Sequence, residues 1–230
     1  VDAQGHIEAV YLLPLAALAL SLRSYWRSIG GGQVHLADLR AALASAGRMK
    51  NLDGGHGEGC NFEDADRYSN ARRYAHQATL YGFLLCFAAT SAGTVLHYGF
   101  GAEAPYGLFR LPKFFGVPGG ILLCLGTAWL AWRKTRADRN LAAAAIWGGE
   151  MAFVILLFAV SATGLLLYAA TGTGAVALLL PLHLGTVLAF FLLTPYSKMA
   201  HGFYRLAALL HEAAATRQAN APDEPARLRT

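Results

Sequence analysis

"HLGTVLAFFLLTPYSKMAH", residues 183–201, decides how the chain folds. Most of it is a continuous apolar run, and crossing a hydrocarbon core roughly 30 Å thick takes about 20 predominantly apolar residues in a helix. His183 and His201 stand at the two ends of the run. The stretch therefore predicts a membrane-spanning helix with an imidazole at each end.

The composition of the whole chain agrees with a membrane protein. Of its 230 residues, 55% are hydrophobic and only 14% are charged, which is too apolar for an ordinary soluble domain of this length. The stretches long and apolar enough to span are residues 76–98, 114–132, 147–170 and 175–194. A fifth, residues 7–22, is shorter and contains Glu8 and Pro14. We expect an all-α, polytopic membrane helical bundle of about five transmembrane helices.

These spans divide the chain into four parts. We expect a first transmembrane or re-entrant segment at 1–22, a cytoplasmic loop at 23–75, a four-helix membrane bundle at 76–197, and a cytoplasmic amphipathic helix with a disordered tail at 198–230. The loop contains a helical pattern, "LADLRAALASAGRM". The first residues lack the basic leader and cleavage pattern of a signal peptide, so the helices themselves are expected to direct insertion.

Basic residues set the expected orientation. Those between the first two spans, and between the third and fourth, are Arg23, Arg27, Arg40, Arg48, Lys50, Arg67, Arg72, Arg73, Arg133, Lys134, Arg136 and Arg139. The opposite connections hold only Arg110 and Lys113. Because basic loops stay in the cytoplasm, we expect a multi-pass protein of the bacterial inner membrane with its N-terminus outside and its C-terminus cytoplasmic.

Four histidines fall at span ends on two antiparallel helices. His76 and His201 share the inner, cytoplasmic level, and His97 and His183 share the outer level. At 100° per residue, His183 and His201 return to the same helix face, whereas His76 and His97 differ by about 60°. At 1.5 Å per residue, the two levels lie roughly 27 to 31 Å apart. The sequence therefore predicts two facing histidine pairs.

Paired imidazoles at this spacing indicate a cytochrome b type of membrane protein. Neutral imidazole is a good axial ligand of haem iron, and two histidines close both axial positions, which suits electron transfer. We expect one or two haems b held by His76, His97, His183 and His201. Nearby cations would pair with the haem propionates at the inner level; these are Arg72, Arg73, Lys198 and Arg205. The alternative is that the histidines merely reach the membrane interface.

Other candidate sites depend on fewer residues. His56, Glu58 and Cys60 in "GGHGEGC" supply three groups of a metal site, but zinc generally needs three or four protein ligands. Glu150 near the inner end of its span is a candidate for quinone or proton chemistry, or for a plain interfacial role. Three cysteines are too few for the four thiolates of an iron–sulfur cubane.

Several longer motifs resemble a known family. These are "LDGGHGEGCN", "YGFLLCFAAT", "LPKFFGVPGG", "WGGEMAFV" and "TPYSKMAHGFYR". They are similar to stretches of the tricarballylate-utilisation protein B family, also called the CitB or CobZ-related membrane electron-transfer proteins. The last motif also resembles the final helix of the nitrate reductase gamma subunit, a dihaem cytochrome b.

The resemblance implies a role in electron transfer. Such a protein reoxidises a partner flavoprotein, such as tricarballylate dehydrogenase, and passes electrons through iron–sulfur centres and haem b to quinone. Family members usually begin with a ferredoxin-like region carrying two cysteine clusters; none occurs here, so the clusters are expected on another region or partner subunit. Membrane lipid is a further expected partner, and nucleic acid is not. A small transporter or channel subunit and a cofactor-free anchor are the competing functions.

Overall fold

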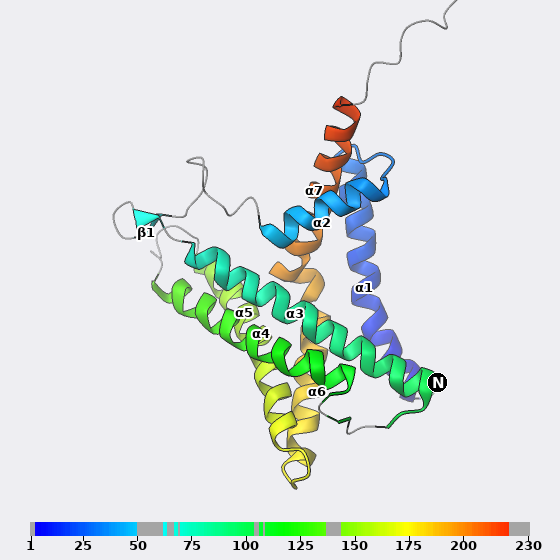
Figure 1. Ribbon diagram of the computed structural model, residues 1–230, viewed down its shortest axis with the longest axis vertical. Helices are drawn as coiled ribbons and strands as arrows, with labels where there is room; N and C mark the ends of the chain where they lie inside the picture. Colours follow the sequence, from blue (N-terminus) through cyan, green and yellow to red (C-terminus); the bar gives the residue numbers. More distant parts are fainter. Residues whose placement is uncertain are drawn as a thin grey trace, which may run out of the picture.

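The computed structural model is almost entirely helical (Figure 1). It describes residues 3–49, 62–63, 67–68, 70–103, 106–107, 109–136 and 144–220. The elements are α1 (Ala3–Ser28), α2 (Leu36–Arg48), β1 (Phe62–Glu63), β2 (Arg67–Tyr68), α3 (Ala71–Thr94), η2 (Val95–Gly99), α4 (Leu111–Arg136), α5 (Ala144–Ala169), α6 (Val176–Leu193), η4 (Thr194–Tyr196) and α7 (Lys198–Ala219). The two strands form one short antiparallel pair. The glycine-rich segment and the tail beyond residue 220 lie outside the described residues.

Four helices are long and apolar enough to cross a membrane. They are Ala71–Gly99, Leu111–Arg136, Gly148–Ala169 and Val176–Tyr196. These helices confirm the four stronger spans expected from the sequence and make the chain a multi-pass membrane protein. The fifth expected span is part of α1, a 26-residue helix that contains Pro14. Its passage through the membrane remains a prediction.

The two helices α3 and α4 form a closely packed antiparallel pair, and they run side by side in Figure 1. Glycines permit the close approach. A Cβ atom on Gly82 would lie 2.5 Å from the backbone nitrogen of Leu123, and one on Gly126 would lie 2.6 Å from that of Thr79. Leu123 itself is fully buried in this contact. Small residues bring membrane helices together because lipid supplies no hydrophobic drive for their association.

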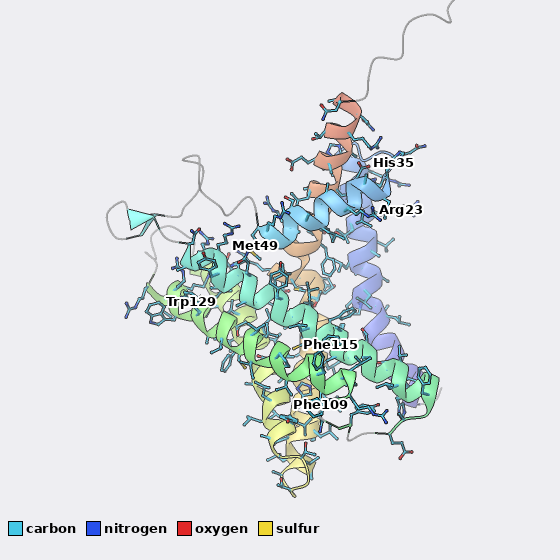
Figure 2. All side chains as sticks on the ribbon, viewed as in Figure 1. Arg23, His35, Met49, Phe109, Phe115 and Trp129 are labelled. Atoms are coloured by element: carbon cyan, nitrogen blue, oxygen red, sulfur yellow. The ribbon has the colours of Figure 1, made fainter. Side chains whose placement is uncertain are left out.

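Helices α5 and α6 complete the bundle. Helix α5 packs between α4 and α6, and Phe190 of α6 is the aromatic centre of the packing. The ring of Phe190 lies 5.7 Å from that of Phe83 on α3 and 6.2 Å from that of Phe153 on α5. Figure 2 labels Phe109 just before α4 and Trp129 towards its other end, so aromatic residues mark both ends of this span.

The predicted helix over residues 183–201 is interrupted. The α-helix α6 ends at Leu193, a single 3₁₀ turn with Pro195 follows, and Ser197 is extended with φ −110° and ψ 174°. The Ser197 hydroxyl accepts a hydrogen bond from the Met199 N–H and so caps a new helix, α7. Because proline disfavours a continuous helix, the expectation that His183 and His201 share one helix face is wrong.

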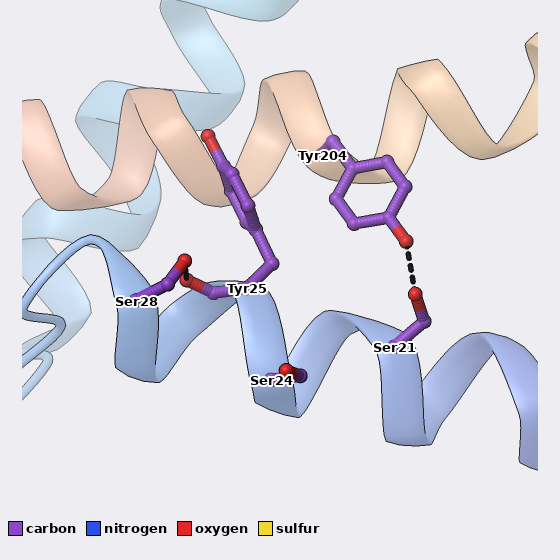
Figure 3. A pocket seen from close by; sticks show the side chains of 5 residues that line it. All are labelled: Ser21, Ser24, Tyr25, Ser28 and Tyr204. Carbon is purple, nitrogen blue, oxygen red and sulfur yellow. Dashed lines mark hydrogen bonds between the residues drawn. The ribbon is translucent and has the colours of Figure 1, made fainter.

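Helix α1 lies against α7 beyond the end of the spans. Figure 3 shows the contact, a shallow groove of about 450 Å³ lined by Ser21, Ser24, Tyr25, Ser28 and Tyr204. The hydroxyls of Ser21 and Tyr204 share a hydrogen bond, and the Tyr25 ring meets the Tyr204 ring edge-on at 5.1 Å. Polar contacts of this kind distinguish the last turns of α1 from the apolar spans.

Candidate functional site

The inner end of the bundle gathers the first histidine pair. His76 lies in the second turn of α3, and His201 lies in the first turn of α7. The two imidazoles are close enough to interact electrostatically, and Arg72 and Lys198 act on His76 in the same way. The chain therefore brings His76 and His201 together from two helices, at one end of the spans.

Positive charge and partial burial keep the imidazole of His201 neutral. Partial burial of the imidazole lowers the pKa of His201, and the nearby Arg205 and Lys198 lower it further. Since the ordinary pKa of histidine is already near 6.5, His201 is neutral at pH 7. A neutral imidazole keeps the lone pair that a metal ligand needs.

The four predicted cations do not all share one role. Arg72 and Lys198 face His76, while Arg205 and Lys198 face His201. Arg73 instead donates a hydrogen bond from Nη2 to the carbonyl of Arg48, at 2.9 Å, and so satisfies the end of α2. Three of the four basic residues thus interact electrostatically with the histidine pair, and the fourth contacts α2.

Glu150 links three helices beside this pair. Its carboxylate forms ion pairs with Lys134 at the end of α4 and Lys198 at the start of α7. The side chains of Glu150 and Lys134 are only 23% and 17% exposed. The first turn of α7, which carries His201, is therefore tied to α4 and α5 through a carboxylate that sequence analysis offered only as an isolated candidate.

Replacing Glu150 with glutamine is expected to lower the stability of the membrane bundle by about 1–2 kcal/mol, because it leaves two lysines without their shared counter-ion. Thermal unfolding of the detergent-solubilised protein measures the loss. The matched control is Glu212→Gln on α7, whose side chain is exposed. Equal unfolding temperatures for the two variants would show that the link between helices contributes nothing.

The third predicted ligand, His183, is held by α5. Its Nδ1 lies 3.0 Å from the Thr163 hydroxyl, which itself lies 2.7 Å from the carbonyl of Ala159. When the hydroxyl donates to that carbonyl, it accepts from Nδ1–H of His183, and the lone pair is then on Nε2. A Cβ atom on Gly164 would lie 3.1 Å from the imidazole, so glycine makes room for the ring. No sequence pattern distinguished Thr163 from other span threonines.

The two outer histidines have different surroundings. His97 lies in the π-helical turn η2, is exposed, and packs its ring edge-on against Tyr98 at 4.9 Å. Counted along the helix axis, His183 lies about 10 Å from the first residue of its span, whereas His97 lies about 3 Å from the last residue of its own. Among the described residues, no side-chain contact joins these two histidines.

Other metal sites receive no support from the described residues. No group of three or more histidine, cysteine, aspartate or glutamate side chains lies within that part of the chain in a metal-binding arrangement. His56, Glu58 and Cys60 fall outside the described residues. Their metal site remains a prediction.

Comparisons with known proteins identify the family. The sequence profile of citrate utilization protein B matches residues 4–223. Citrate utilization protein B of Escherichia coli is 42% identical over 202 residues, which is 88% of this chain and 53% of the relative. The chain thus spans about half the length of that relative, and no solved structure matches. The resemblance found in the motifs is confirmed, and the chain belongs to the citrate utilization protein B family.

Proposed function

We propose that the chain is a membrane-anchoring cytochrome b subunit, which relays electrons between a cytoplasmic flavin or iron–sulfur donor and the quinone pool. The observation that carries this proposal is the approach of His76 and His201 at one end of the spans. His76 and His201 would hold the iron of a haem from two different helices.

The surrounding residues fit a haem at this inner position. The imidazole of His201 is neutral, and the cations Arg72, Lys198 and Arg205 lie beside the two histidines. Cationic side chains at this position pair with the carboxylates of propionate groups. Haem b, when bound, supplies reversible one-electron chemistry at its iron.

The chain itself contributes placement. Helix α3 fixes His76, and α7 fixes His201 through the ion pairs that Glu150 makes with Lys134 and Lys198. A haem held by both histidines would supply electron transfer rather than oxygen activation. At the outer level, His183 is oriented by Thr163, and the ring of His97 packs against Tyr98. The residues therefore fit one haem at the inner level.

We infer the electron donor from the name of the relative. The E. coli relative is named for citrate utilization, and we infer that the donor here is a flavoprotein that oxidises a tricarboxylic acid, such as tricarballylate dehydrogenase. Iron–sulfur clusters are placed on another region or subunit, because the chain has only three cysteines. We place the protein in the bacterial inner membrane, with five spans and a cytoplasmic C-terminus.

A pigment spectrum tests the proposal. The protein purified from a haem-replete host is expected to give the reduced-minus-oxidised absorption difference of low-spin haem b. Pyridine haemochrome analysis of the same sample gives the haem to protein ratio, for which we expect one. A colourless, folded preparation would contradict the proposal and favour a cofactor-free anchor or a transporter subunit.

A further inference from the structure

Helix α2 exposes a stripe of leucines although it is not a span. Leu36, Leu39 and Leu43 are 63%, 37% and 51% exposed and recur at helical spacing along one face. The opposite face carries Asp38 and Ala42, which are buried. A helix with one buried face and one exposed apolar face needs a second apolar environment.

The buried face of α2 is fixed to α7. The Arg217 Nε atom donates to Asp38 Oδ1 at 2.9 Å, and the His35 N–H donates to the other carboxylate oxygen at 2.9 Å. The hydrogen bond from Arg217 lowers the pKa of Asp38 below its ordinary value, so this contact is complete above about pH 4 and is lost only as the pH falls through the lowered pKa. The leucine face is consequently held outward at neutral pH.

The end of α2 lies at the depth of the membrane surface. Tyr81 of α3 donates a hydrogen bond from its hydroxyl to the carbonyl of Gly47 at 2.9 Å. Tyr81 lies about 15 Å along the span that begins at Ala71, and that whole helix measures about 43 Å against a hydrocarbon core roughly 30 Å thick. A helix centred in the bilayer has entered the apolar layer before Tyr81, so α2 ends beside lipid.

A basic residue beside the leucines suits a membrane surface. Arg40 is exposed and lies on the edge of the leucine face, about 40° around the helix from Leu36. Arg48 in the last turn lies about 120° from Leu36 and lines the groove side of the helix instead. An apolar face with a basic residue at its edge is typical of helices that lie in the headgroup region, where anionic lipids attract the basic side chain.

We propose that α2 is an interfacial helix whose occupant is the lipid leaflet at this end of the spans. Leu36, Leu39 and Leu43 enter the acyl boundary, and Arg40 contacts anionic headgroups. This docking fixes the end of α3 that carries His76 and the helix that carries His201, since α2 contacts both. The contact of α2 with the lipid leaflet does not depend on whether the protein binds haem.

Site-directed nitroxide labels test the occupant directly. The full chain, with Cys60, Cys86 and Cys124 replaced by alanine, is reconstituted in vesicles of phosphatidylcholine with or without phosphatidylglycerol. A label on Leu39→Cys is expected to be relaxed more by oxygen, which concentrates in lipid, than by a water-soluble nickel chelate. The matched control is Ala41→Cys, exposed on the groove side of the same helix, where the order should reverse.

Three outcomes would overturn the proposal. Preferential relaxation of the Leu39 label by nickel would place the leucine face in water, and protection from both agents would show that protein covers it. Equal depth of the Leu39 label in vesicles with and without phosphatidylglycerol would exclude the contact with anionic headgroups. If that contact exists, phosphatidylglycerol places the label deeper, and Arg40→Gln is expected to abolish this difference. A second label on Leu43→Cys must give the result of Leu39→Cys, which guards against a local folding defect.

Discussion

Replacing His201 with alanine is expected to abolish the haem b absorption of the inner site. His201 lies in the first turn of α7, close enough to His76 to interact with it electrostatically, and its removal would take away one of the two residues that would hold the haem. His76→Ala should give the same loss, because the pair acts as one unit. Reduced-minus-oxidised spectra and the haem to protein ratio measure the effect, while any haem bound elsewhere is spared.

The control for this experiment lies on the same helix. His211 of α7 packs its ring against Trp26 of α1 at 6.2 Å and takes no part in the inner pair. His211→Ala should retain the full haem content. Full haem content in the His201→Ala variant would refute the pairing, and a loss in both variants would show that α7 itself had failed to fold.

Replacing Gly82 with alanine is expected to destabilise the bundle by about 3 kcal/mol, the upper part of the range for overpacked interiors. The added Cβ atom would lie 2.5 Å from the backbone nitrogen of Leu123 and 2.8 Å from its Cα. Both are backbone atoms, so no side-chain rotation relieves the clash and α3 must separate from α4. A fall in the thermal unfolding temperature in detergent, with loss of haem as the helices part, measures the effect.

The matched control is a glycine at which an added Cβ atom would contact no other residue. Gly185 lies in α6, and a Cβ atom there would meet nothing within 4 Å. Gly185→Ala should therefore leave stability unchanged or raise it by up to about 1 kcal/mol through better helix propensity. Native stability in the Gly82→Ala variant would mean that the close approach of α3 and α4 does not hold the bundle together.

The four spans could be predicted because the length of an apolar run is a local property of the sequence. The inner pair could also be predicted, since two antiparallel helices place the start of one beside the end of the other. Pro195 signalled a bend, but how far α7 turns depends on its contacts with α1, α2 and α5. The direction of His201 is therefore a tertiary property that helix phase alone could not supply.

The surroundings of the two outer histidines could not be predicted from the sequence. Residue counts placed His97 and His183 at one level, yet the depth of a residue depends on where its span begins, and η2 changes the helical twist at His97. The orientation of His183 depends on one threonine hydroxyl of a neighbouring helix. Contacts of that kind join positions twenty residues apart and leave no periodic trace in the sequence.

The interruption between α6 and α7 bears on how the protein responds to bilayers of different thickness. A span adjusts to a thicker or thinner hydrocarbon core by changing its tilt, and a rigid extension would swing through the same angle. The 3₁₀ turn and the extended Ser197 separate α7 from that rotation, while Glu150 and Arg217 fasten α7 to its neighbours. The geometry around His201 is therefore expected to stay the same when α6 changes its tilt in response to hydrophobic mismatch.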